Sequence, residues 1–387
     1  MQFDLTEEER MIQKTARDFA RKELAPVAKE NNEKGIFPAE IYAKLAGLGF
    51  LGMTMPEKYG GVDLGTFSLV LVLEEISRVC ASTSVVLSVQ NSLINWAILK
   101  YGSEELRDAY LPRLASGEIL GAYALTEPAA GSDVAALQLS AVRTGDEYIL
   151  NGTKIFISTG DKAGVVIVFG RTDPHERTHG ISAFIVEPDF PGFSVGKVED
   201  KMGLKASTTV ELVFEDCRVP ASHLLGTEGD GMRIALAGLD GGRIGIAAQS
   251  VGIAQAALDE AVLFARERQQ FGKRIVDFQA TRWKIADMAT QIEAARLLMY
   301  RAAKLRDAGR PCTKEAAMAK LFASIASNRV AYDALQIHGG VGYTKEFTIE
   351  RLFRDARVTE IYEGTSEIQR LVISRQVLEE YDSLFPS

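Results

Sequence analysis

The chain has 387 residues, 47% of them hydrophobic and 25% charged, which is the composition of an ordinary globular protein with room for two or three domains. No apolar run approaches the roughly 18 residues of a membrane span, and a net charge of -8 argues against nucleic acid as a partner because phosphate binding needs clustered Lys and Arg. The three cysteines, Cys80, Cys217 and Cys312, are far apart without a C-x-x-C pair, so we expect a cytoplasmic protein with no cysteine metal site.

The first third of the chain, residues 1–120, has helical periodicity. Thr6 and Glu9 have the spacing of a capping box, which predicts a helix that begins there and includes Phe19. No basic and apolar stretch precedes it, so we expect no signal peptide. Residues 67–76 are apolar enough to form a buried helix.

Two further patterns in the sequence do not predict ligand sites. Residues 47–52 satisfy G-x-G-x-x-G, but they follow a helical pattern, whereas a dinucleotide-binding fingerprint follows a strand and opens a helix. His175 and His179 lie four apart in a turn-rich stretch, and His223 and His338 are isolated. We therefore expect neither a Rossmann site nor a histidine metal site.

Residues 121–230 alternate with a period of two, which predicts a β domain. Asn151-Gly152 predicts a hairpin turn, since both positions of that turn need positive φ. This region has 16 Asp and Glu against 9 Lys and Arg, so it is either an acidic solvated surface or a docking patch. The expected strands are 147–150, 154–158, 165–169, 182–186 and 210–214.

Helical spacing returns over residues 231–387, with long helices expected at 253–266, 278–307 and 314–336. No repeat, low-complexity tract or flexible linker separates the three zones. We therefore expect them to pack together as a helical domain, a small β domain and a second helical domain.

Three stretches have the composition of ligand-binding loops. Residues 123–133 combine small residues and hydroxyls, which suits close approach of the backbone to a flat ring and a phosphate. Residues 266–272 end a helix with cations and amides, and residues 336–343 end another in glycines that leave backbone amides exposed. Taken singly, each could equally be a helix cap or a loop.

Glu363 is the candidate general base. It lies between Tyr362, an apolar neighbour that can raise a carboxyl pKa, and Gly364, which lets a ligand approach the backbone. Ser366 and Gln369 have capping-box spacing and predict that a helix restarts there, which leaves Glu363 in a short break. On spacing alone, the pattern favours a solvated glutamate at a helix end over a general base.

Together these segments resemble the acyl-CoA dehydrogenase family over nearly the whole chain. The motifs occur in the family's order: the first signature at residues 123–132, the flavin-facing strand at 154–158, R-x-x-F-G at 268–272, Q-I-x-G-G at 336–340 and I-Y-E-G-T-x-x-I-Q-R at 361–370. The sequence of residues 361–373 is most similar to that of short-chain, or butyryl-CoA, dehydrogenases.

The resemblance implies an α-helical N-terminal domain, a small β-barrel-like middle domain and a C-terminal four-helix bundle, at 1–120, 121–230 and 231–387. It also implies FAD bound without a Rossmann fold, and usually a homotetramer. The FAD contacts it implies come from Tyr123, Leu125, Thr126, Gly131, Ser132, Phe156, Ile157, Ser158, Thr365 and Glu367. Arg268, Gln270 and Gln279, with Gln336, Ile337, Gly339 and Gly340, would reach the FAD of a neighbouring subunit, and Phe271 belongs to the same cofactor-binding element.

The resemblance also implies the chemistry. Glu363 would remove the α-proton of an acyl-CoA while the β-hydrogen leaves as hydride to flavin N5, giving a trans-2-enoyl-CoA, with electron transfer flavoprotein as the electron acceptor. Gly242 stands where a long-chain or isovaleryl-type enzyme carries glutamate, which favours a short- or medium-chain substrate. The residues expected to face the CoA substrate are Ser132, Asp240, Arg243, Tyr362 and Gly364.

Other interpretations remain open at this stage. Residues 86–99, with Asn91, Leu93 and Trp96, would floor the acyl pocket, or they could be helix-packing core. An acyl-CoA oxidase-like flavoenzyme would share the same first half-reaction and return electrons to oxygen. A non-catalytic acyl-CoA-binding protein is the alternative from another class.

Overall fold

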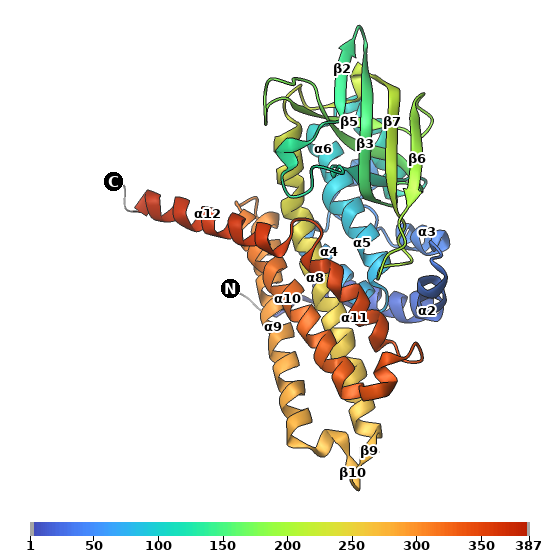
Figure 1. The fold of residues 1–387 in the computed structure, drawn as a ribbon, viewed down its shortest axis with the longest axis vertical. Coiled ribbons are helices and arrows are strands. Elements are labelled where there is room, and N and C mark those ends of the chain that lie inside the picture. The colour runs from blue at the N-terminus through green and yellow to red at the C-terminus, as the bar shows by residue number, and fades with distance from the viewer. Residues whose placement is uncertain (1–3, 385–387) are drawn as a thin grey trace.

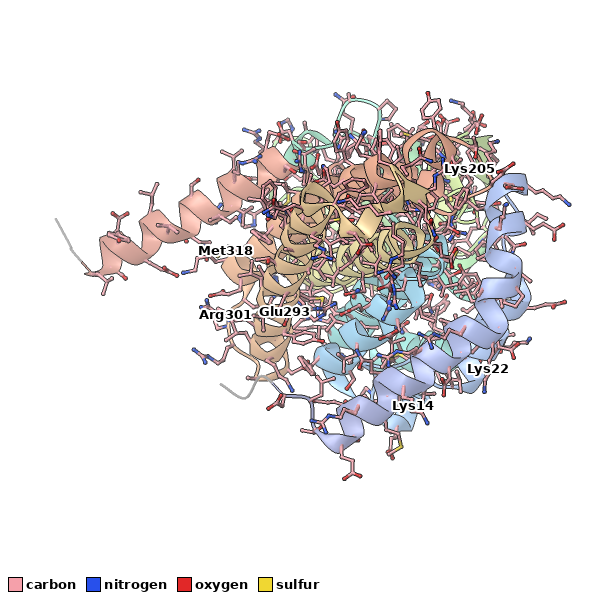
Figure 2. The ribbon with its side chains drawn as sticks, turned by 90° about the horizontal axis from the view of Figure 1, so that it is seen from below. Lys14, Lys22, Lys205, Glu293, Arg301 and Met318 are labelled. Carbon is pink, nitrogen blue, oxygen red and sulfur yellow. The ribbon has the colours of Figure 1, made fainter. Side chains whose placement is uncertain are left out.

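The computed structural model describes residues 4–384 and is mainly helical, with a sheet at one end (Figure 1). Helix α8 (Gly231–Glu267) begins beside the sheet and runs to the opposite end of the molecule, and α9 (Gln279–Asp307) and α10 (Thr313–His338) extend from the middle to that same end. Helix α12 (Ser366–Leu384) projects from the body in Figure 1 and in Figure 2. Within the described residues, no helix combines the length and apolarity that crossing a membrane would require.

The N-terminal region is helical, as the periodicity predicts. Thr6 and Glu9 form both bonds of the capping box, and Lys14 and Lys22 follow along the outer edge of the molecule in Figure 2. Residues 47–52 follow a helix rather than a strand, so the geometry of a Rossmann fingerprint is absent there. The helices are α1 (Glu7–Phe19), α2 (Ala25–Lys34), α3 (Ala39–Gly47), α4 (Gly65–Ser77), α5 (Ala81–Val89), α6 (Trp96–Tyr101) and α7 (Glu104–Ala115), with π-helical turns at Ala20–Leu24 and Gln90–Asn95.

The middle region is an eight-stranded sheet in the order β6-β7-β3-β2-β4-β5-β8, with β1 paired in parallel to β4. Among the described residues the two ends of this path, β6 and β8, do not pair, so the sheet is not closed into a ring by hydrogen bonds. The strands are β1 (Leu120–Ala124), β2 (Ser140–Thr144), β3 (Glu147–Ser158), β4 (Ala163–Arg171), β5 (Ile181–Val186), β6 (Phe193–Val198), β7 (Thr209–Pro220) and β8 (Leu224–Leu225).

The hairpin predicted at Asn151-Gly152 is wrong. Both residues lie inside the continuous strand β3, where the register against β7 shifts between Leu150 and Gly152. Gly152 has φ 145°, and Asn151 exchanges hydrogen bonds with Asp216 of β7, donating at 3.1 Å and accepting at 2.8 Å. A β-bulge uses the same positive-φ residue types as a tight turn, which is why the dipeptide was misleading.

The C-terminal helices share one hydrophobic core with the N-terminal helices, and the sheet has a second core of its own. Two contacts of α9 fix it against α4. Arg296 pairs with the buried Glu74 at 2.8 Å, and the Asp307 carboxylate accepts from the backbone N–H groups of Thr66 and Phe67 at 2.6 and 2.8 Å. The helical regions therefore form a rigid frame on which the shorter helix α11 (Ile349–Arg357) and α12 are placed.

Candidate functional site

Glu363 lies in the predicted break, between a 3₁₀ turn (Val358–Glu360) and α12. Its φ is 49° and that of Gly364 is 90°, so two consecutive residues are left-handed. A non-glycine residue in this region costs about 1–3 kcal/mol and persists only where its surroundings hold it. The Gly364 carbonyl accepts from Lys320 Nζ at 2.7 Å and from Gln369 Nε2 at 2.9 Å.

The helix cap beside this break differs from the prediction. Thr365, not Ser366, caps α12, because its hydroxyl accepts from the N–H of Ile368 at 3.4 Å. The Gln369 amide reaches back to the carbonyls of Glu363 and Gly364 instead of closing a capping box with Ser366. Thr365 and Ser366 are both residue types that can cap a helix, and with the turn at Gly364 the earlier of the two, Thr365, is the N-cap.

The carboxylate of Glu363 differs from that of a solvated glutamate in two properties. Its Oε2 atom is buried and has no hydrogen-bond partner among the described residues. Burial raises the pKa of Glu363 to about 7, although the positive charges of Lys320 and Arg243 oppose that shift. A solvated glutamate would show neither property, and a base with a pKa near neutrality is what proton abstraction at physiological pH requires.

Helix α8 supplies the space in front of this carboxylate. A Cβ atom on Gly242 would lie 1.9 Å from Glu363 Oε2, so only glycine leaves room for it. Arg243, which is 4% exposed, pairs with Asp240 at 2.9 Å, and Asp240 also accepts from the Thr313 hydroxyl at 2.6 Å. The structure thus brings the predicted Asp240 and Arg243 to the same helix turn as Gly242.

Aromatic hydroxyls complete the surroundings of Glu363. Tyr362 donates a hydrogen bond to the side-chain oxygen of Gln249 on α8. Tyr123, at the end of β1, has a buried hydroxyl with no partner among residues 4–384, and it faces α8 where a Cβ on Gly238 would lie 3.4 Å away. Burial and the nearby charge of Glu363 hold the pKa of Tyr123 and of Tyr362 well above the usual range. Ser132, also predicted to face the substrate, is exposed in the loop after β1.

A second group of predicted residues lies where β1 and β3 meet. The Leu125 carbonyl accepts from Lys154 Nζ at 3.1 Å, and the Thr126 carbonyl accepts from the Ile155 N–H at 2.9 Å. The predicted cofactor segment is thereby fixed to the predicted flavin-facing strand.

Sequence reasoning missed the ion pair behind this junction. Lys154 Nζ lies 2.8 Å from Glu127 Oε1, and the Glu127 carboxylate also accepts from the N–H groups of Gln138 and Leu139 at 2.5 and 2.9 Å. Both side chains are buried. The signal that could have found the pair is a lysine at an inward position of a strand, which requires a buried partner.

Phe156 gives this junction a flat apolar surface. Its ring is 61% exposed and its φ is 57°, at a register shift of β3 between Lys154 and Ile157. Ile157 is buried below it, and Ser158 is half-buried beside it. An exposed ring on the strand that is bonded to the Leu125-Thr126 backbone, with a half-buried hydroxyl at Ser158, fits a planar cofactor. Thr365 is half-buried and Glu367 is exposed at the start of α12.

The third predicted group lies at the far end of the molecule. Figure 1 shows the hairpin of β9 (Gln269–Gln270) and β10 (Lys273–Arg274) opposite the sheet. The end of α10 lies beside the end of α8, where the His338 and Phe264 rings stack at 4.5 Å. The residues predicted to contact a neighbouring subunit's FAD, which lie at this end, are Arg268, Gln270, Phe271, Gln279, Gln336, Ile337, Gly339 and Gly340. One chain therefore does not bring them to Phe156.

The segment predicted to floor the acyl pocket divides into two parts. Leu93 and Trp96 face α8 at Gly238, within 3.5 Å of where its Cβ would lie, one turn before Gly242. Asn91 instead donates to the Phe50 carbonyl at 2.9 Å and accepts from the Met53 N–H at 2.8 Å, so it holds the N-terminal core together.

Known proteins resemble this chain over nearly its whole length. Three family models match in order: the N-terminal domain of acyl-CoA dehydrogenases at residues 6–118, the middle domain at 122–217 and the C-terminal domain at 229–378. The chain is 51% identical to the acryloyl-CoA reductase (NADH) of Anaerotignum propionicum, covering 98% of this chain and 96% of that protein. It is 49% identical to the human mitochondrial short-chain specific acyl-CoA dehydrogenase, covering 98% and 92%.

Solved structures agree with these sequence matches. The butyryl-CoA dehydrogenase of Megasphaera elsdenii is 46% identical and superimposes with a TM-score of 0.96, covering 98% of this chain and 100% of that one. A chain from a structure described as the electron transferring flavoprotein of Acidaminococcus fermentans is 49% identical, with the same TM-score and coverage.

Proposed function

The chain belongs to the acyl-CoA dehydrogenase family, and on that premise we propose that it converts a short- to medium-chain acyl-CoA into the trans-2-enoyl-CoA with Glu363 as the base. It is an FAD-dependent oxidoreductase that acts on CH–CH groups. The observation that carries the choice of base is the buried Glu363 Oε2 atom, which has no partner among residues 4–384.

The reaction removes two hydrogens from neighbouring carbons. FAD, when bound, supplies the acceptor for the β-hydrogen, which leaves as hydride at flavin N5. Glu363 takes the α-proton onto its carboxylate, and the electron pair of the broken Cα–H bond becomes the second bond between Cα and Cβ. Burial keeps the proton affinity of Glu363 high enough for this step, while Lys320 and Arg243 keep its ionised form accessible.

Three groups of residues would hold the cofactor. The main chain from Tyr123 to Ser132 would lie against the ring and the phosphates, and Phe156 and Ser158 would face the flavin. The hairpin and the turn at the far end of the bundle would serve the FAD of a neighbouring subunit, because within one chain the hairpin of β9 and β10 is remote from β3, the strand that carries Phe156 (Figure 1). This arrangement supports a homo-oligomer, and by family a homotetramer. Leu371, Leu378 and Leu384, each more than 60% exposed along the projecting α12, are consistent with burial against another subunit.

A short- to medium-length acyl chain is the proposed substrate class for two reasons. Gly242 carries no carboxylate, so the alternative base position of long-chain types is vacant. Leu93 and Trp96 pack against α8 one turn away, close to the place where an acyl chain beside Glu363 would extend. Electron transfer flavoprotein is the proposed electron acceptor, and the acidic middle region offers a surface for charge-guided docking.

Anaerobic titration of the purified holoenzyme with acyl-CoAs of increasing length tests the proposal. The wild-type flavin absorbance should bleach most readily with short chains. Glu363→Gln should keep its yellow cofactor and fail to bleach, while the control Glu360→Gln, a surface residue paired with Arg357 at 2.7 Å, should bleach like the wild type. Full bleaching of Glu363→Gln would refute the choice of base, and stoichiometric peroxide in air would point to an oxidase instead.

A further inference from the structure

One face of α10 holds both ends of the segment that carries Glu363. Asn328 Nδ2 donates to the Ala356 carbonyl at 2.9 Å, at the start of that segment. Two turns earlier on the same helix, Lys320 Nζ donates to the Gly364 carbonyl at 2.7 Å, directly after the base. The segment between these two anchors, which includes the 3₁₀ turn Val358–Glu360, is therefore fixed to α10, and Lys320 is the anchor closer to the chemistry.

The Lys320 contact is made where the backbone is strained. Glu363 and Gly364 are both left-handed, at φ 49° and 90°. Their two carbonyls are held only by side chains among the described contacts: Gln369 Nε2 reaches both, at 3.2 and 2.9 Å, and Lys320 reaches the second. A left-handed glutamate persists only under such restraint, and its χ1 direction depends on that backbone.

Lys320 also has an unusual charge environment. Its side chain is completely buried, yet it forms no ion pair with a carboxylate anywhere in residues 4–384. The second cation facing Glu363, Arg243 on α8, is paired with Asp240 at 2.9 Å, so part of its charge is taken up. Glu360 and Glu367 interact with Lys320 from farther away, and Tyr123 and Tyr362 are the other titratable groups that face Glu363.

We propose that Lys320 is the positioning residue of the base: it fixes the left-handed Glu363-Gly364 backbone through the Gly364 carbonyl, and its unpaired ammonium stabilises the ionised form of Glu363. This inference rests on the proposed role of Glu363 as the base. Burial lowers the pKa of Lys320 to about 8, against the attraction of Glu363, so the ammonium is the main form at neutral pH and is lost in mildly alkaline solution.

Infrared difference spectroscopy of the holoenzyme measures the ionisation of Glu363 directly, with its carboxyl band assigned by absence in Glu363→Gln. Lys320→Met should move the titration midpoint of that band upward by about one pH unit or more, because a cation near a carboxylate typically lowers its pKa by 1–3 units. The pH midpoint of kcat/KM should move by the same amount, so that kcat/KM at pH 6.5 falls about tenfold or more. Asn328→Ala is the matched control on the same helix face, and it should leave the midpoint in place.

The backbone part of the proposal is tested without any change of charge. Gln369→Leu removes the other donor to the same carbonyls, and it should lower kcat at every pH with its midpoint unchanged. An unmoved infrared midpoint in Lys320→Met would overturn the electrostatic part of the proposal. An unchanged kcat in Gln369→Leu would overturn the part that concerns the backbone. If Lys320→Met does not fold, Lys320→Gln replaces it in the same measurement. Turnover by Glu363→Gln would refute the proposed function. The infrared midpoint tests the role of Lys320 separately, because it measures the ionisation of Glu363 and does not depend on turnover.

Discussion

Two buried lysine–glutamate neighbourhoods, one in the sheet and one in the helical bundle, use the same residue types in opposite ways. In the sheet, Glu127 accepts three hydrogen bonds, one of them from Lys154 at 2.8 Å. In the bundle, Lys320 bonds a carbonyl instead, and Glu363 Oε2 accepts nothing from the described residues. A carboxylate whose bonding capacity is used up serves structure, whereas one left unsatisfied beside a cation is available for a proton.

The largest expected effect comes from breaking the satisfied pair. Glu127→Gln leaves the Lys154 ammonium buried without a counter-charge, which should lower the free energy of unfolding by about 3–5 kcal/mol. Lys154→Met should cost less, because Glu127 keeps two backbone N–H donors. Urea or thermal unfolding of the holoenzyme measures both.

Glu30→Gln provides the control for this pair. Glu30 forms a shorter contact with Lys34, at 2.6 Å, but both side chains are more than 60% exposed. Its unfolding midpoint should not change measurably, since exposed pairs contribute little. If Glu127→Gln were as mild as Glu30→Gln, burial would not distinguish the two pairs.

Replacing Glu363, whose charge is unsatisfied, should raise the free energy of unfolding instead of lowering it. The pKa of Glu363 is raised from 4.5 to about 7, so between these values the unfolded chain has released a proton that the folded chain retains. The folded state therefore loses stability as pH rises from about 4.5 to 7, and the loss persists above pH 7. Glu363→Gln does not titrate, so it should exceed the wild type in stability by about 2–3 kcal/mol at pH 8.

Thermal unfolding at pH 5 and pH 8 measures this difference. The two proteins should unfold at similar temperatures at pH 5, and the variant should unfold at the higher temperature at pH 8. A temperature difference that is the same at both pH values would mean that Glu363 is not a destabilising buried charge.

The contrast between the two neighbourhoods also separates what sequence can predict from what it cannot. The long helices, the β structure of the middle region and the break at Glu363 were confirmed, because each depends on a local period or on a glycine, although β5 is buried at every position and does not alternate. The contacts of Lys154 and Lys320 were missed. Lys154 contacts a residue 27 positions away and Lys320 one 44 positions away, and from sequence alone an isolated lysine is expected to be solvated. The predictions of a turn at Asn151-Gly152 and of a cap at Ser366 were wrong for a related reason. Each local sequence is compatible with two structures, and contacts with the rest of the protein determine which one forms.

Filling the space beside the unsatisfied oxygen should change activity and not stability. A methyl on Gly242 would lie 1.9 Å from Glu363 Oε2, so Gly242→Ala must push the carboxylate away from the substrate. A displacement of about 1 Å can lower kcat/KM by about a hundredfold, with the bound FAD unchanged. Gly47→Ala, which has no neighbouring atom within 4 Å, should have the activity of the wild type.

A double variant tests whether contact with the methyl is the cause. Glu363→Asp shortens the side chain and withdraws its oxygens from α8, so it should cost less kcat/KM in the Gly242→Ala protein than in the wild type. Equal costs in both backgrounds would show that the methyl acts elsewhere on the helix. A smaller cost would show that the carboxylate of Glu363 needs the space that Gly242 leaves by having no side chain.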